Sequence, residues 1–170
     1  LPSFLPTVEA ILRARGQEVA GLESDKWIIC QCAQERQSKN RLLESQANFP
    51  FHNGIPSTFE NFTVKPGTEE CYMAAKAFAA GLGPHVLVLS GTVGNGKTHL
   101  LEAIGHEVIN RGWSVRYEQV PEFLARIRTT FNNPDKENPM GRAELATVLL
   151  LDDIGLEKRS DWTAEVITTL

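Results

Sequence analysis

Short apolar runs alternate with amphipathic stretches over the second half of the chain, which is the pattern of strands and helices in turn. Two continuous apolar runs and one run of alternating apolar and polar residues predict three strands, at 86–90, 113–117 and 148–152. Apolar positions at helical spacing predict three helices, over 69–80, over 97–111 and from Pro121 onward. Strands that alternate with helices are typical of a parallel sheet covered by helices, so we predict an α/β fold.

The first third of the chain has a weaker pattern. Residues 7–20 have near-helical apolar spacing, whereas residues 33–47 are polar and favour a solvated helix or a linker. A loop signal of Asn, Gly and Pro follows at 53–56. We therefore divide the chain into an N-terminal helical or linker segment, 1–53, and a second part, 54–170. Within that second part, residues 131–142 contain two Asn-Pro steps and are predicted to be a loop.

Composition fits an ordinary globular protein of 170 residues, with 42% hydrophobic and 22% charged residues. The net charge of -4 argues against a surface that coats nucleic acid as a whole. The densest positive run comprises Arg111, Arg116, Arg126 and Arg128. These arginines could contact DNA phosphates, but a solvated face with internal ion pairs is the favoured interpretation.

The chain contains no apolar run near the roughly 20 residues that a membrane-spanning helix requires, and no secretory signal is recognised. Its three cysteines are an odd number, which argues against a disulfide framework and favours a reducing, cytoplasmic setting. Cys30 and Cys32 could be half of a zinc site with His52 and Cys71, but the spacing is unusual and free thiols are favoured. The chain starts without Met and stops inside an apolar stretch, so we expect a fragment.

Residues 91–98 satisfy the pattern G-x-x-x-x-G-K-[ST], between a predicted strand and a predicted helix. Glycines permit positive φ angles, so that backbone amides can surround a triphosphate at the positive end of the helix. Lys97 adds a point charge at the phosphates, and Thr98 offers a hydroxyl to Mg²⁺. The predicted ATP-binding residues are Gly91, Thr92, Val93, Gly94, Asn95, Gly96, Lys97, Thr98 and His99.

A second acidic motif follows at the end of the apolar run 148–151. The carboxyl ends of strands form the ligand-binding edge of open parallel sheets, so Asp152 is expected beside the phosphate loop. Asp152 is predicted to hold Mg²⁺ together with Thr98. Asp153 is predicted to orient and polarise the attacking water, which makes Asp153 and Lys97 the candidate catalytic residues.

The paired motifs Gly91–Leu100 and Leu149–Leu156 resemble those of the AAA+ ATPases of the DnaC/DnaI helicase-loader and IstB transposition-helper group. Segments 58–62 and 160–166 resemble the same group, and the resemblance covers 54–170. It extends weakly to 27–32, which is similar to the end of a cysteine-bearing N-terminal domain in some loaders.

The resemblance implies the N-terminal part of an AAA+ ATP-binding domain, truncated after the Walker B strand. It implies ATP and Mg²⁺ as cofactors, single-stranded DNA and a replicative helicase as partners, and assembly with like subunits. Two alternatives stay open: a transposition helper with a transposase as partner, and an adaptor that binds ATP without hydrolysing it. Many relatives have Glu where this chain has Asp153.

The resemblance also implies that sensor residues, an arginine finger and one internal strand follow the second motif. Buried backbone groups left unpaired by a missing strand cost roughly 1–3 kcal/mol each. We therefore expect the isolated chain to be poorly stable and nearly inactive.

Other aromatic and histidine side chains also have purely structural interpretations. Phe59 and Phe62 could flank an adenine or anchor the core, His99 and His106 are read as structural, and Trp162 as a packing residue.

Overall fold

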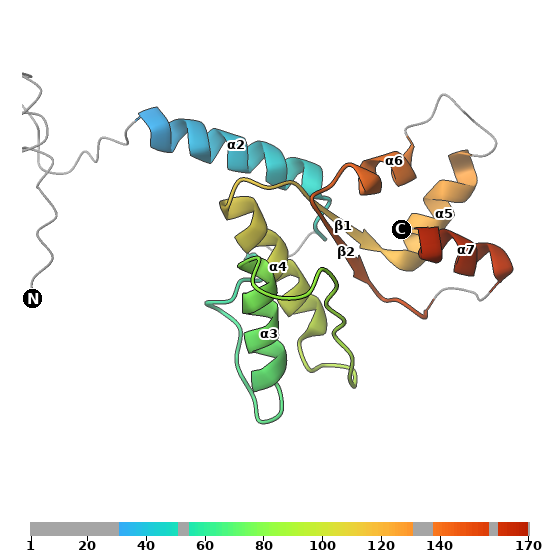
Figure 1. Ribbon diagram of the computed structural model, residues 1–170, viewed down its shortest axis with the longest axis horizontal. Coiled ribbons are helices and arrows are strands. Elements are labelled where there is room, and N and C mark those ends of the chain that lie inside the picture. Colours follow the sequence, from blue (N-terminus) through green and yellow to red (C-terminus); the bar gives the residue numbers. More distant parts are fainter. Residues whose placement is uncertain (1–30, 51–54, 131–137, 157–159, 170) are drawn as a thin grey trace, which may run out of the picture. The chain divides into compact units, whose positions relative to one another are not determined.

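The computed structural model describes residues 31–50, 55–130, 138–156 and 160–169 (Figure 1). Its helices are α2 (Gln31–Ala47), α3 (Glu69–Ala79), α4 (Lys97–Asn110), α5 (Val120–Thr130), α6 (Pro139–Glu144) and α7 (Asp161–Thr169). Its strands are β1 (Val115–Gln119) and β2 (Val148–Asp152). The predicted helix over 7–20 lies outside the described residues.

Strands β1 and β2 pair in parallel, with Val115 opposite Val148 and Gln119 opposite Asp152. The predicted parallel arrangement is therefore confirmed for these two strands. β1 begins two residues later than the predicted 113–117, because Trp113 lies outside the paired register and is 46% exposed. β1 therefore ends at Gln119, which pairs with Asp152, the last residue of β2.

Apolar side chains of β2 alternate between two hydrophobic cores, one on each face of the sheet. Leu150 belongs to the core formed with α3 and α4, and Val148 packs against that core. Leu149 and Leu151 pack against the second core, which α5, α6 and α7 supply. The strand is thus covered by helices on both faces, as the continuous apolar run predicts.

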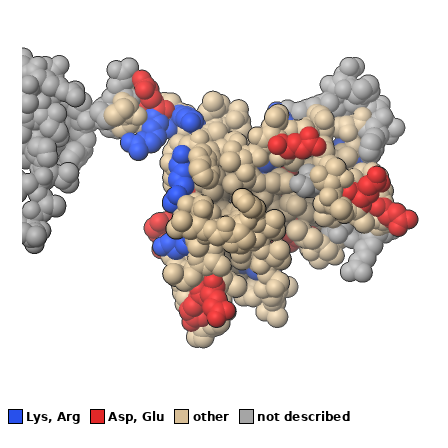
Figure 2. All heavy atoms as spheres, viewed as in Figure 1, with Lys and Arg blue, Asp and Glu red and all other residues tan. Residues whose placement is uncertain are grey.

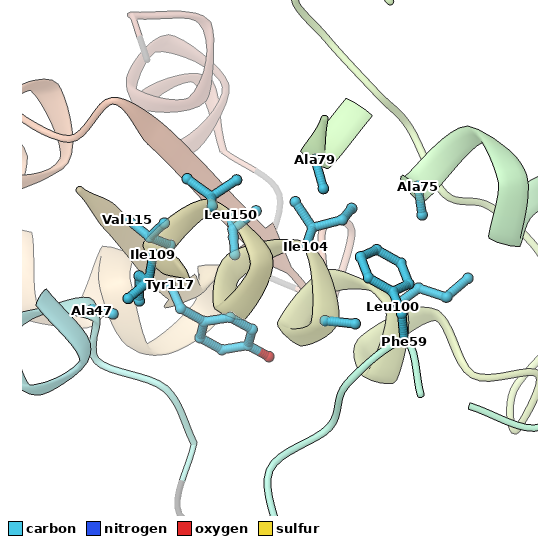
Figure 3. Packing of buried hydrophobic residues seen from close by; sticks show 12 residues of the cluster. Ala47, Phe59, Ala75, Ala79, Leu100, Ile104, Ile109, Val115, Tyr117 and Leu150 are labelled. Atoms are coloured by element: carbon cyan, nitrogen blue, oxygen red, sulfur yellow. The ribbon is translucent and has the colours of Figure 1, made fainter. Parts of the chain in front are cut away.

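Helix α4 is the centre of the first core, shown in Figure 3. Its side chains Leu100 and Ile104 are only 2% and 1% exposed, and the small Ala75 and Ala79 of α3 pack in the same core. Gly105 lets the helix approach the sheet, since a Cβ there would lie 2.9 Å from Leu150 and 2.6 Å from Phe49. The helix that follows the phosphate loop is therefore fixed firmly to the strand that carries Asp152.

The predicted strand at 86–90 is wrong. Within the described residues β1 pairs only with β2, and the run 86–90 has no strand partner. Leu87 and Leu89 pack against the core, but Val86 and Val88 are 73% and 78% exposed. A cavity of about 540 Å³ lies between this segment and β2. An extended run becomes a strand only when another strand lies within hydrogen-bonding distance, and no described strand pairs with this run.

The loop predicted over 131–142 is also wrong at its end, because α6 begins at Pro139. The Asn138 side chain accepts a hydrogen bond from the Met140 amide at 3.1 Å, and Pro139 occupies the first turn. Asn as a cap and Pro in the first turn are helix-starting residues. The same Asn-Pro step that suggests a loop therefore starts a short helix.

The polar stretch 33–47 is a helix, α2, as one of the two predictions had it. Its last residue, Ala47, is fully buried, and Phe49 packs against the same core as α4. Residues Glu35–Leu170 form one compact unit. The domain boundary near residue 54 stays a prediction. Among the described helices, none combines the length and the apolar character needed to cross a membrane.

Candidate nucleotide-binding site

The phosphate loop has the backbone conformation that its glycines predict. Gly91, Gly94 and Gly96 have φ angles of 147°, 82° and 85°, which side-chain-bearing residues rarely adopt. A Cβ on Gly91 would lie 2.6 Å from the side-chain Nδ2 of Asn95, which can rotate away, whereas one on Gly96 would lie 2.6 Å from the Phe62 ring. The loop therefore requires glycine at 91 for its conformation, and at 96 for both conformation and space.

Lys97 folds back onto this loop from the first position of α4. Its ammonium donates hydrogen bonds to the backbone oxygens of Gly91 and Thr92, at 3.1 and 2.9 Å, and to Asn95 Oδ1 at 3.3 Å. Because its three acceptors all belong to residues 91–95, the ammonium is held directly against the loop. A phosphate oxygen could take the place of these neutral acceptors and form a charge-assisted hydrogen bond.

Thr98 and Asp152, the two predicted magnesium ligands, are brought together. Thr98 Oγ1 donates a hydrogen bond to Asp152 Oδ2 at 2.8 Å, across 54 residues of sequence. No cluster of three or more His, Cys, Asp or Glu able to hold a metal occurs in the described part of the chain. A hydroxyl and one carboxylate nevertheless fit Mg²⁺, which is bound by few protein oxygens beside substrate phosphates and waters.

Tyr117 completes this arrangement, and the sequence analysis did not single it out. Its phenol donates a hydrogen bond to the same Asp152 Oδ2 at 2.7 Å. Burial, followed by the interaction with the Asp152 carboxylate, raises the pKa of Tyr117, which keeps the phenol a donor. The sequence holds one signal for this role, the position of Tyr117 in β1. Because side chains alternate along a strand, Tyr117 lies on the face of β1 that packs against α4, opposite Leu150. It also precedes by two residues the residue that pairs with Asp152.

Asp153, the predicted water-activating acid, follows directly after β2 and is exposed. Its φ of 57° is one of two positive values among the described non-glycine residues. Its amide donates to Asp152 Oδ1 at 3.0 Å. This amide and the Tyr117 and Thr98 hydroxyls engage both carboxylate oxygens of Asp152, so that its orientation is fixed from three sides.

His99 and the segment before the loop support the start of α4. The His99 Nε2 lies 2.8 Å from the backbone oxygen of Thr58, and its ring meets the Phe62 ring edge-on at 5.2 Å. Phe62 in turn stacks on Tyr72 at 5.6 Å, and Phe59 is 7% exposed. Phe59 and Phe62 therefore have packing partners, as the core-anchor interpretation expects, and a role of His99 in nucleotide binding stays a prediction.

The phosphate loop is open to solvent, with Val93 99% exposed. The cavity of about 540 Å³ described above lies instead along the 83–89 segment and β2. The loop is the candidate site because of its chemistry: a glycine-rich backbone, an ammonium, a hydroxyl and a fixed carboxylate. The cavity is lined mainly by apolar side chains.

The arginine run forms ion pairs and an aromatic contact. Arg111 pairs with Glu107 at 3.2 Å, Arg116 and Arg126 both pair with Glu118, and Arg128 lies 4.5 Å from the Trp162 ring centre. On the face seen in Figure 2, basic side chains lie over and below α2 and acidic ones at the lower end of α3 and over α7, and the described residues form no broad basic band on this face. The favoured interpretation of internal pairing is confirmed for three of the four arginines.

The zinc alternative is not tested, because Cys30 and His52 lie outside the described residues. Cys32 is exposed and Cys71 is half-buried.

Comparison with known proteins gives a match to the model of the bacterial DnaA ATPase domain over residues 55–170. The chromosomal replication initiator protein DnaA of Aliarcobacter butzleri is 33% identical over 137 residues, which are 77% of this chain and 31% of that protein. The replicative helicase loader DnaC of Escherichia coli K12 is 26% identical over 166 residues, which are 91% of this chain and 66% of the loader. The chain thus spans about a third of the DnaA relative and just under two thirds of the DnaC relative.

Solved structures agree with the sequence relatives. A DNA replication initiation factor matches with a TM-score of 0.62 and 29% identity, covering 71% of this chain and 38% of that one. AMPPCP-bound DnaA from Aquifex aeolicus matches with a TM-score of 0.57 and 28% identity, covering 66% and 36%. These matches confirm the P-loop AAA+ fold class. The loader resemblance is confirmed by the DnaC relative, and DnaA initiators, which the sequence analysis did not name, match as well. The chain belongs to the bacterial DnaA ATPase domain family.

Proposed function

We propose that this chain binds Mg-ATP at residues 91–98 and hydrolyses it as part of a protein of DNA replication. The observation that carries the proposal is the 2.8 Å hydrogen bond from Thr98 to Asp152. It joins a phosphate-loop hydroxyl to an acid that lies 54 residues later, and magnesium-dependent nucleotide binding needs these two groups side by side.

Each residue of the site has a distinct part in this proposal. The loop amides and the α4 N-terminus would bind the phosphates, and Lys97 would exchange its carbonyl partners for phosphate oxygens. Thr98 and Asp152 would hold Mg²⁺, which when bound neutralises phosphate charge. Tyr117 would keep Asp152 turned toward Thr98, and Asp153 would orient the attacking water.

The place in replication is proposed from the relatives, which are named as an initiator and a helicase loader. A protein that resembles both is expected to act on single-stranded DNA, to associate with a replicative helicase and to assemble with like subunits. The transposition-helper alternative shares the same motifs and differs in its partner, a transposase.

Titration calorimetry and phosphate release with Mg-ATP test the nucleotide part. We expect saturable binding that Lys97→Ala abolishes and Asp152→Asn weakens, with Lys65→Ala, an exposed lysine outside the site, as the matched control. Turnover lost in Asp153→Asn with binding retained would support the hydrolytic role. Binding without any turnover by the full-length protein would favour the adaptor alternative, and absence of binding would contradict the whole proposal.

A further inference from the structure

The segment that follows α2 is attached to the strand β1 at two neighbouring residues. Asn48, the first residue after α2, donates a hydrogen bond from its side-chain amide to the backbone oxygen of Tyr117 at 3.1 Å. Arg116 donates in the opposite direction, from Nη1 to the backbone oxygen of Gln46 at 3.1 Å. These two hydrogen bonds restrain both the distance and the orientation of the segment relative to β1.

The backbone conformation of Asn48 explains why asparagine suits this position. Its φ of 62° lies in the left-handed region, which ends many helices and which asparagine tolerates better than most residues with a side chain. Glycine would adopt this φ as readily, but it has no side-chain amide. Asparagine therefore combines the conformation that ends α2 with a hydrogen-bond donor for Tyr117.

The oxygen that Asn48 binds lies on the edge of β1 that faces away from β2. The Val148 amide donates to the Ser114 oxygen at 3.1 Å, and in a parallel ladder alternate residues of a strand bond to the same neighbour. The even-numbered residues of this strand therefore bond toward β2, and Tyr117 points to the opposite edge. Within the described residues β1 has no second strand neighbour, so a side-chain donor takes the place of a ladder bond at Tyr117.

The ring of Tyr117 is contacted from the same segment. The Phe49 ring centre lies 6.0 Å from that of Tyr117 and 4.5 Å from that of His106, which belongs to α4. Ala47 and Tyr117 are buried in one hydrophobic core (Figure 3), and Phe49 packs against that core. The residues at 48 and 49 thus contact Tyr117 at its backbone oxygen and at its ring.

The placement of Tyr117 matters to the candidate magnesium site, because its phenol donates to Asp152 at 2.7 Å. Such a bond depends on both distance and alignment, which follow from where β1 holds residue 117 and from how its ring is packed. Asn48 and Phe49 contact these two parts of Tyr117. We propose that Asn48 is a positioning residue of the magnesium site, which acts on Asp152 through Tyr117. This role rests on the proposed function, because it concerns the same metal site.

Asn48→Gly tests this role in the whole chain, since glycine keeps the left-handed φ and removes only the side chain. We expect the Mg²⁺ concentration needed for tight nucleotide binding to rise at least about threefold, by less than in Tyr117→Phe, because Asn48 acts one step further from the metal. Nucleotide binding without Mg²⁺ should stay unchanged, which would show that the variant is folded and that its phosphate loop is intact.

The matched control is Asn138→Gly, which removes another exposed asparagine side chain that bonds to the backbone at a helix end. It should keep the native Mg²⁺ dependence. A double variant then separates positioning from a general structural role. If Asn48 acts through the Tyr117 hydroxyl, Asn48→Gly should change the Mg²⁺ requirement of Tyr117→Phe by less than about 1.5-fold, whereas independent effects would add.

The outcomes distinguish this role from the proposed function. A native Mg²⁺ dependence in Asn48→Gly, an equal rise in Asn138→Gly, or additive effects in the double variant would overturn the role of Asn48 and leave the proposed function in place. A native chain that does not bind Mg-ATP would overturn both.

Discussion

The phenol of Tyr117 donates a hydrogen bond to Asp152 at 2.7 Å, and so links β1 to the acid at the end of β2. Thr98 donates to the same carboxylate oxygen at 2.8 Å. Because both donors are neutral hydroxyls, they orient the carboxylate without cancelling its charge. The neighbouring strand therefore takes part in the geometry of the candidate magnesium site.

Tyr117→Phe should loosen Asp152 while keeping the ring packed in the core. Outer hydrogen bonds to metal ligands typically contribute 10–100-fold to metal affinity. We expect the Mg²⁺ concentration needed for tight nucleotide binding to rise about tenfold, with metal-free nucleotide binding unchanged. Nucleotide titrations at a series of Mg²⁺ concentrations measure this. An unchanged Mg²⁺ dependence would show that Tyr117 serves the core alone.

His106 should make stability fall as the solution becomes acidic. Burial lowers its pKa below the ordinary 6.5, and Glu44 and Glu102 offset this effect only in part. The folded state therefore disfavours the charged ring, which stacks on Phe49 at 4.5 Å. Its contribution to stability is fully present above pH 6.5 and is lost as the pH falls toward its folded-state pKa.

The variant His106→Gln should have a flatter dependence of the free energy of unfolding on pH between 7 and 5 than the native chain. His85→Gln, at an exposed position, is the control and should keep the native slope. Chemical denaturation at several pH values measures both. A native slope in His106→Gln would contradict the assignment.

Gly105→Ala should destabilise the fold through crowding, since a Cβ there would lie 2.6 Å from Phe49 and 2.9 Å from Leu150. Overpacking of this kind typically costs about 1–3 kcal/mol. The double variant with Phe49→Ala should be less destabilised than the sum of the two single changes, because the missing ring leaves room for the methyl group. Denaturant melts of the four proteins measure the coupling, and strict additivity would contradict the close approach.

The segment 85–90 should expose an apolar surface in the 170-residue chain. Val86 and Val88 are largely exposed, and the adjoining cavity is lined by apolar residues of β2 and α4. Exposed apolar runs without strand partners bind hydrophobic dyes and promote self-association. We expect strong fluorescence with anilinonaphthalene sulfonate, reduced in Val88→Lys but not in Val93→Lys, a control in the phosphate loop. No fluorescence in the native chain would contradict this description.

Local patterns predicted most helices and the meeting of Thr98 with Asp152. The phosphate loop and the acid after an apolar strand are defined by short segments, and the packing of α4 against β2 brings Thr98 to Asp152. Tyr117 could not be identified in this way, because its role depends on the register of β1 against β2. The run 86–90 was misassigned because an apolar run alone does not make a strand, which also needs a neighbouring strand within hydrogen-bonding distance. Asn138 and Pro139 were misassigned because the same residue types serve both turns and helix starts.

The thermal melt of the chain with and without Mg-ATP tests the central claim, that residues 91–98 bind nucleotide phosphates, most directly. At 100 times the dissociation constant, binding should stabilise the fold by about 2.7 kcal/mol. For a domain of this size that raises the Tm by roughly 5–10 °C. Lys97→Ala should abolish the rise while Lys65→Ala keeps it. A Tm that does not respond to Mg-ATP, or a rise that persists in Lys97→Ala, would contradict the account.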